Sequence, residues 1–547
     1  MNIFKKKQIL FLFCLLFSVF ACEDLDELVE NPNGIDPENS NLNLILSTVL
    51  TETGMTVVDL GYGDIAGVMQ HTQKDAWFSG HNDYDWSDQS WAGYYSILVD
   101  NEKVYEKAVE QGLEFQQGVT MVMKAYLFGT IADLWGDAPF TYAIQGDLGG
   151  TEYLTPAYDS QADIYHGVIE YLQSANTLLS KDAEEYDEIY EEGDVFYEGD
   201  PAKWRKLANS LMLRYYMRLS EKEPTFAQSG IEAIMADQNT YPVITESGDD
   251  ALMDFLSDKS ENSWPGNSEL TDVSGSEYRR KKMCATLVDK MQELTDPRLE
   301  LWAQKVEIPL VIDETLSSGT DTIIDNVRYL ATDAIGEESI DTDPEYVGLP
   351  PSVSALPSSY NLNPTPGQLS YNPHVSYLNE RYTQASGDFL QSRLLTASEV
   401  NFILAEAAQR GWSVAGDAQS YYEAAVLASF EYWGVDDQYS DYILGEAAFD
   451  GTLAQIIEQK WISNWAAAAE SWFDYRRTGY PELVAGPAAD RSVLPVRFYY
   501  MTDELLINST NANEAVDALE ETSYTQADGK NSAWAKFWLL QGTTKPW

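Results

Sequence analysis

The sequence predicts a mainly α-helical protein: a scaffold of tetratricopeptide-like helix pairs with a loop-rich, partly β insert that bears the binding face. Two observations predict the helices. Apolar side chains recur at spacings of three and four, and capping residues and glycines mark the ends of these segments. A third observation predicts the insert, because the helical pattern fails and proline becomes frequent between about 240 and 395. The helical scaffold is then expected over about 40–240 and 395–547.

The N-terminus predicts export. Three lysines at 5–7 precede an apolar stretch, 9–21, of about 13 residues, too short to cross a hydrocarbon layer of roughly 30 Å as a helix. Residues 1–21 are therefore interpreted as a signal peptide. Because a small residue precedes Cys22 and an acidic run follows it, the segment resembles a bacterial lipoprotein signal in which Cys22 is lipidated. Ordinary cleavage that leaves Cys22 unmodified is the alternative.

The composition restricts the possible partners and chemistry. The 547 residues include 88 Asp+Glu against 34 Lys+Arg, a net charge of −54, which disfavours nucleic acid and anionic lipid surfaces. A hydrophobic content of 44% excludes a disordered acidic chain. Four His and three Cys leave little for zinc or thiol chemistry. We therefore expect a function other than reactive catalysis, not an enzyme, with no cofactor and no metal.

The helix boundaries follow from capping signals. Asp200 before Pro201 predicts a helix start, and an apolar stripe continues to residue 219. The segment 396–399 predicts a capping box at the start of a helix that ends at Gly411. The segment 420–423 predicts a second capping box, at the start of a helix that ends at Gly434. The segments 115–135 and 164–179 predict another helix pair.

The insert is predicted to be irregular. Seven prolines lie within 344–373, which predicts loop, and β-like runs at 306–311 and 322–330 flank it. Such an insert is a common place for recognition, and solvent-facing padding is the alternative.

Candidate ligand-binding residues lie in a loop where seven aromatic residues fall within the 19 positions 77–95. Sugars stack their C–H faces on aromatic rings and bond their hydroxyls to amides and carboxylates. The candidates are Trp77, Asn82, Asp83, Tyr84 and Trp86. The helical spacing of Trp91, Tyr94 and Tyr95 instead predicts core positions.

A second polar turn contributes Asn262 and Trp264, although Trp264 could equally anchor the turn against the scaffold. The acidic segment 83–88 imitates the start of a calcium loop but lacks its glycine and terminal glutamate. A fortuitous acidic loop is therefore favoured, and a calcium site stays an alternative.

Several ordered motifs resemble those of the SusD/RagB superfamily of Bacteroidetes surface lipoproteins. They are 115–140 with its Trp-Gly-Asp-Ala-Pro end, 203–211, Asp296-Pro297-Arg298, 399–412, 458–461, 472–481 and 494–497. The resemblance covers nearly all of 22–547, which is expected to form a single SusD-like domain. Within these motifs, Arg476 and Arg477 beside Asp474 favour an internal ion-pair network over a ligand clamp.

The resemblance implies an outer-membrane lipoprotein that faces outward and passes captured oligosaccharide, expected to be neutral, to a SusC-like TonB-dependent transporter. A peptide-capturing relative, a surface glycoside hydrolase and a partner-binding scaffold are the alternatives.

Overall fold

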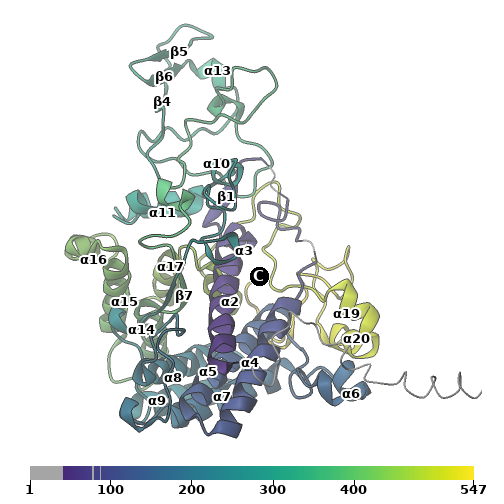
Figure 1. The fold of residues 1–547 in the computed structure, drawn as a ribbon. Coiled ribbons are helices and arrows are strands. Elements are labelled where there is room, and N and C mark those ends of the chain that lie inside the picture. The colour runs from purple at the N-terminus through teal and green to yellow at the C-terminus, as the bar shows by residue number, and fades with distance from the viewer. Residues whose placement is uncertain (1–40, 77–78, 87) are drawn as a thin grey trace, which may run out of the picture.

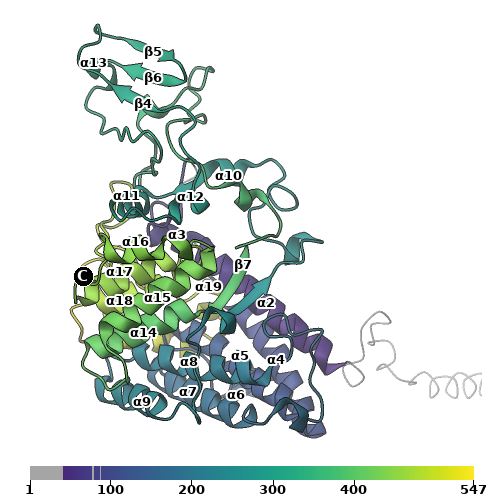
Figure 2. The ribbon, with the colours of Figure 1, turned by 90° about the vertical axis from the view of Figure 1, so that its left-hand side faces the viewer.

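The computed structural model describes residues 41–76, 79–86 and 88–547, and its long helices pack around one large apolar core (Figure 1). The first group of long helices is α2 (Leu42–Tyr62), α4 (Ala92–Gln111), α5 (Glu114–Trp135), α7 (Gln161–Leu178), α8 (Pro201–Arg218) and α9 (Pro224–Ala236). The second group is α14 (Ala397–Gln409), α15 (Ala418–Trp433), α16 (Tyr439–Leu444), α17 (Leu453–Ser463) and α18 (Ala468–Thr478). Figure 2 shows the second group stacked above α8 and α9 of the first. The mainly helical prediction is confirmed.

The helices begin close to the predicted residues. The Asp200 carboxylate accepts hydrogen bonds from the first backbone N–H groups of α8, and the Thr396 hydroxyl accepts one from Glu399 at the start of α14. The prediction of a box at 420–423 is wrong. Helix α15 begins three residues earlier because Asp417 caps it, with the Ser420 N–H donating to Asp417 Oδ1 at 2.8 Å. A carboxylate suits the positive helix N-terminus better than a hydroxyl.

The predicted pairs are present, since α5 packs against α7 and α14 packs against α15. Helix α8 lies against α7 and α5, where Gly129 gives room to the Tyr215 side chain. Gly434, in the left-handed conformation, ends α15 as predicted.

The insert holds short elements. Its helices are α10 (Ser276–Arg280), α11 (Ala285–Glu293), α12 (Leu299–Trp302) and α13 (Thr332–Ile335). Strand β1 (Thr72–Lys74) pairs antiparallel with β3 (Lys281–Met283), and β2 (Ala251–Asp254) pairs antiparallel with β7 (Gln391–Leu395). In the third sheet, β6 (Val327–Leu330) lies between β4 (Leu310–Ile312), which is parallel to it, and β5 (Asp321–Ile324), which is antiparallel.

The third sheet and α13 form a tip that projects from the helical body (Figures 1 and 2). A small apolar core of its own, which includes Leu310, Leu330, Leu349 and Tyr360, supports the base of this tip. Between 344 and 373 the only helical turn is 358–360, so the predicted loop is confirmed.

The remaining helices are short. They are α3 (Asp64–Val68), α6 (Thr151–Leu154), α19 (Thr502–Ile507) and α20 (Ser509–Ala518). Among the described residues, one stretch, 42–68, has the length and apolar composition to cross a membrane. In the fold this stretch is α2 followed by α3, and α2 packs against α4, β7 and α18 as a core helix.

Buried ion pairs join helices that are distant in sequence. Arg214 of α8 bonds both carboxylate oxygens of Glu399 of α14, each at 2.8 Å, and both side chains are almost completely buried. Arg477 of α18 bonds Glu406 of α14 and also Asp474, 2.8 Å away, so the predicted internal ion-pair network is confirmed.

We expect Arg214→Met to lower the free energy of unfolding by about 3–5 kcal/mol, because it leaves the buried Glu399 carboxylate without its bidentate partner. Urea denaturation measures the change. The matched control is Lys305→Met, which removes an exposed ion pair to Glu345 and should leave the stability nearly unchanged. Equal losses in the two variants would contradict the assignment.

The Glu406 pair also predicts a pH dependence. Burial opposes ionisation of Glu406, but the Arg477 guanidinium holds its pKa below the ordinary value. A lowered carboxyl pKa stabilises the fold above the unfolded-state pKa of about 4, and this stabilisation is lost as pH falls through the folded-state pKa. The stability difference between wild type and Glu406→Gln should therefore plateau above about pH 5 and shrink at acid pH. A difference that is constant across urea titrations from pH 3 to 7 would refute it.

Candidate functional site

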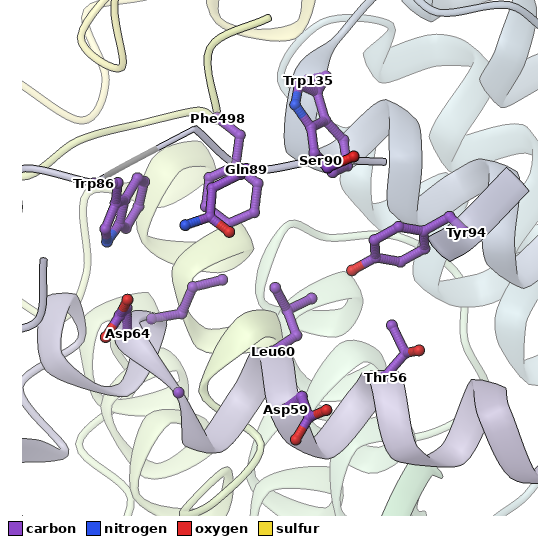
Figure 3. A pocket seen from close by; sticks show the side chains of 12 residues that line it. Thr56, Asp59, Leu60, Asp64, Trp86, Gln89, Ser90, Tyr94, Trp135 and Phe498 are labelled. Atoms are coloured by element: carbon purple, nitrogen blue, oxygen red, sulfur yellow. The ribbon is translucent and has the colours of Figure 1, made fainter. Parts of the chain in front are cut away.

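A cavity of about 320 Å³ lies between the C-terminal half of α2, the start of α3 and the loop that leads into α4 (Figure 3). Its volume falls within the range of roughly 300–1,000 Å³ that is typical of small-ligand sites. No residue of the insert, 240–395, lines it. The helical scaffold alone therefore builds this cavity.

Four aromatic side chains form one side of the cavity. The Trp86 and Phe498 rings meet edge to face with centroids 5.0 Å apart, and Trp135 lies 5.4 Å from Phe498 and 5.9 Å from Tyr94. These rings come from the loop, from α4, from the end of α5 and from a C-terminal segment. Figure 3 shows them opposite α2 and α3, with the Tyr94 hydroxyl directed into the space. Polarised C–H groups of a ligand would meet apolar surface here.

Polar side chains lie on both sides of the cavity: those of α2 and α3 are opposite the rings, and those of the loop lie beside the rings (Figure 3). Thr56 and Asp59 belong to α2, Asp64 begins α3, and Gln89 and Ser90 belong to the loop. Together they supply carboxylate, amide and hydroxyl groups. Within the described part of the chain, no lysine or arginine lines the cavity. The site therefore suits a ligand that is rich in hydroxyl groups and carries no negative charge.

The two carboxylates differ in their electrostatic surroundings. Burial opposes ionisation of Asp64, but His81 Nδ1, 3.2 Å from Asp64 Oδ1, and nearby lysine charges lower its pKa. Desolvation raises the pKa of Asp59, and the Lys281 charge offsets only part of that effect. Asp64 is therefore held ionised, whereas Asp59 takes up a proton more readily.

Two indole nitrogens at the cavity lack acceptors. Trp86 and Trp135 are 4% and 1% exposed, yet within the described part of the chain neither Nε1–H has a hydrogen-bond partner. A buried donor without an acceptor costs about 1–3 kcal/mol. In Figure 3 the Trp86 nitrogen points toward the side of the cavity where Asp64 lies. A ligand oxygen placed there would satisfy it.

Trp86 also borders a second, smaller cavity of about 250 Å³, lined by Asp85, Asp528, Asn531 and Trp534 among others. Its backbone carbonyl accepts a hydrogen bond from the Tyr499 hydroxyl at 2.9 Å. Trp86 is thus a partition between two cavities rather than a platform exposed on both faces.

The other loop candidates have structural contacts. Asn82 is fully buried and bonds the backbone of Lys74 and the carbonyl of Val353. Asp83 is half-buried, and its carboxylate accepts the N–H groups of Gly80 and Asp85. Tyr84 is also fully buried and does not line the cavity beside Trp86. Trp77 and Cys22 lie outside the described residues.

The second predicted turn is also interior. Trp264 is 1% exposed and packs between Tyr62, 5.1 Å away, Phe255 and Tyr382. Asn262 is buried and accepts the Lys259 N–H. Neither residue lines the cavity beside Trp86, so the structure does not bring the two predicted groups together. The alternative, that Trp264 anchors the turn, agrees with its contacts.

Sequence reasoning missed most of the cavity. Three polar lining residues lie on α2 and α3: Thr56, Asp59 and Asp64. The apolar pattern that predicts a helix does not identify single polar residues as part of a site. Tyr94, predicted as core, is 9% exposed and also lines the cavity. The available signal was the spacing of three and five residues between the polar positions Thr56, Asp59 and Asp64. Among the described residues, no group of three or more His, Cys, Asp or Glu side chains is placed to hold a metal ion.

A family model described as "Starch-binding associating with outer membrane", of SusD-like type, matches residues 37–310 and 345–501. The unmatched segment 311–344 is most of the projecting tip. No curated protein matches the sequence.

Solved structures are similar along almost the whole chain. A Bacteroides vulgatus protein, proposed to be an outer membrane protein involved in nutrient binding, is 26% identical with a TM-score of 0.69, covering 92% of this chain and 100% of that one. A chitin-binding protein is 24% identical with a TM-score of 0.70, covering 91% and 99%. A SusD homologue of Bacteroides fragilis is 22% identical with a TM-score of 0.70, covering 91% and 100%. The fold is therefore shared.

The burial of Trp264 predicts a stability effect without a binding effect. Trp264→Ala should lower the free energy of unfolding by about 3–5 kcal/mol, because a large buried ring is removed. Where the variant remains folded, its affinity for any glycan that the wild type binds should be unchanged. Denaturation and calorimetry measure the two quantities. Leu444→Ala, at a position that is 83% exposed, is the control and should change stability by no more than about 0.5 kcal/mol.

Proposed function

Because the chain belongs to the SusD-like family of starch-binding proteins that associate with the outer membrane, we propose that it captures an oligosaccharide and passes it to a SusC-like TonB-dependent transporter. A nutrient-binding role at the outer membrane follows from the family. The proposal adds the ligand class, the partner, a lipid on Cys22, an outward orientation and the absence of catalysis. Nucleic acid is not among the proposed partners.

The observation that carries the proposal is the cavity beside Trp86. Rings and the Gln89 amide on one side, with carboxylate and hydroxyl groups on the other, supply the stacking and hydrogen bonding that a sugar needs. The unpartnered N–H group of Trp86 adds a donor that a ligand oxygen would satisfy. Trp77, Asn82, Asp83, Tyr84, Asn262 and Trp264 were further candidates, and of these only Trp77 stays part of the proposal.

The charge of the cavity supports an uncharged glycan. Asp59 and Asp64 line it without a lysine or arginine, so a sulfate or uronate group would bring a third negative charge into a partly desolvated space. Like charges in such a space repel one another strongly. Neutral starch-like or chitin-like chains meet no such penalty.

To test the proposal, the purified protein is titrated calorimetrically with a panel of neutral and acidic polysaccharides. A neutral glycan should bind, and Gln89→Ala should weaken it about tenfold, equivalent to ~1.4 kcal/mol, because one cavity amide is lost. Gln419→Ala, on the exposed surface of α15, is the matched control and should bind normally. Tighter binding of an acidic glycan, or of an unstructured peptide, would refute the ligand class.

A second candidate function is glycoside hydrolysis. Asp59 with a raised pKa and Asp64 with a lowered pKa line one cavity, a combination that can serve as general acid and base. Reducing-sugar release by the wild type that is lost in Asp59→Asn would favour this function. Binding without release would favour capture.

A further inference from the structure

A larger cavity, of about 480 Å³, lies between α11, α17 and the segment that follows α18. Helix α11 lies directly above α17 in Figures 1 and 2. This α11–α17 cavity shares no lining residue with the cavity beside Trp86. It is therefore a separate place where a ligand could bind.

The α11–α17 cavity carries an excess of negative charge. One cation, Lys290, lines it, and the Lys290 Nζ lies 2.9 Å from Glu293 Oε2 and 3.4 Å from Glu458 Oε2. Three further carboxylates line the cavity and form no ion pair within the part of the chain that the structure describes: Glu446, Asp450 and Glu482. Burial raises the pKa of Glu458, Lys290 offsets part of this, and the charges of Glu293 and Asp450 raise it further. An added positive charge would relieve this repulsion.

A second observation is independent of the acidic residues. Gln459 lines the cavity and is only 1% exposed. Its Oε1 accepts a hydrogen bond from the Tyr442 hydroxyl at 3.0 Å, but its Nε2 has no acceptor among the described residues. Side-chain amides are usually satisfied when buried. The free N–H group points to a ligand that brings an oxygen acceptor as well as a positive charge.

We propose that the α11–α17 cavity binds a saccharide that carries a protonated primary amine, such as a deacetylated amino sugar. The ammonium group would donate to Asp450 or Glu482, and a hydroxyl or ring oxygen would accept from Gln459. Tyr480 and Leu483 line the cavity with apolar surface for the sugar C–H groups, and the Lys545 Nζ lies 5.3 Å from the Tyr480 ring centroid. A metal ion would leave the Gln459 N–H unused, and a neutral sugar would leave the carboxylates without a counter-charge. This inference does not rest on the function proposed for the cavity beside Trp86.

The test uses glucosamine trimer and N-acetylglucosamine trimer, titrated calorimetrically into the full chain at low ionic strength and a pH that keeps the amine protonated. The glucosamine trimer should bind at least tenfold more tightly. Glu482→Gln, at an exposed position, should weaken that binding about tenfold, and Gln459→Leu should weaken it as well. Circular dichroism confirms that each variant is folded.

Gln89→Ala separates the two cavities, because it should leave glucosamine binding unchanged even if all neutral glycan binding is lost. Equal affinity for the two trimers would overturn the inference, and so would an unchanged affinity in Glu482→Gln. Trilysine that binds as tightly as the glucosamine trimer would also overturn it, since the cavity would then recognise charge without the sugar.

Discussion

A continuous set of buried ion pairs in the helical body is the interaction on which the rest of the structure depends. It joins five carboxylates, Asp133, Glu399, Glu406, Glu470 and Asp474, with six cations, Arg214, Arg218, Arg410, Lys460, Arg476 and Arg477. These side chains come from α5, α8, α14, α17 and α18, apart from Arg410 just after α14. Because an unpaired buried charge is costly, none of these helices can shift without the others. The network thus fixes the relative positions of both helix groups.

One member of this network also holds the cavity beside Trp86. The Arg476 guanidinium donates to the Asp133 carbonyl at 2.6 Å and to the Val496 carbonyl at 3.0 Å. Asp133 and Val496 each lie two residues before an aromatic wall of the cavity, Trp135 and Phe498. Arg476 also stacks on Trp472, whose ring lies 5.3 Å from that of Trp86. Residues 472–477 of the family motif therefore do not line the cavity but position its aromatic rings from the protein interior.

Local signals in the sequence could predict much of this fold, and non-local contacts explain what they missed. Caps such as Asp200 and Thr396 act within four residues, so they are visible in the sequence. The pairing of Arg477 with Asp474, three residues before it, was predicted, but its other partner, Glu406, lies 71 residues away and could not be predicted. The location of Trp264 was not predictable for the same reason. Its polar neighbours in the sequence suggested a ring at the surface, whereas Tyr62 and Tyr382, which are distant in the sequence, cover it. Cavities depend entirely on such contacts.

The charge balance of the network decides what the surface can bind. With six cations and five carboxylates, the network has a net charge of +1. Since the whole chain has a net charge of −54, the residues outside the network have a net charge of −55. Because these basic residues are paired in the core, they do not offset the carboxylates at the surface. The excess negative charge of the surface therefore repels an anionic ligand.

Within that field the two cavities differ in local compensation. Asp64 has His81 beside it and lysine charges nearby, which leaves the cavity beside Trp86 suited to neutral hydroxyl groups. Among the described residues, Glu446, Asp450 and Glu482 form no ion pair, so we expect the α11–α17 cavity to prefer a ligand that brings its own positive charge. We therefore expect two different selectivities on the same acidic surface, set by which carboxylates have a positive charge of the protein nearby.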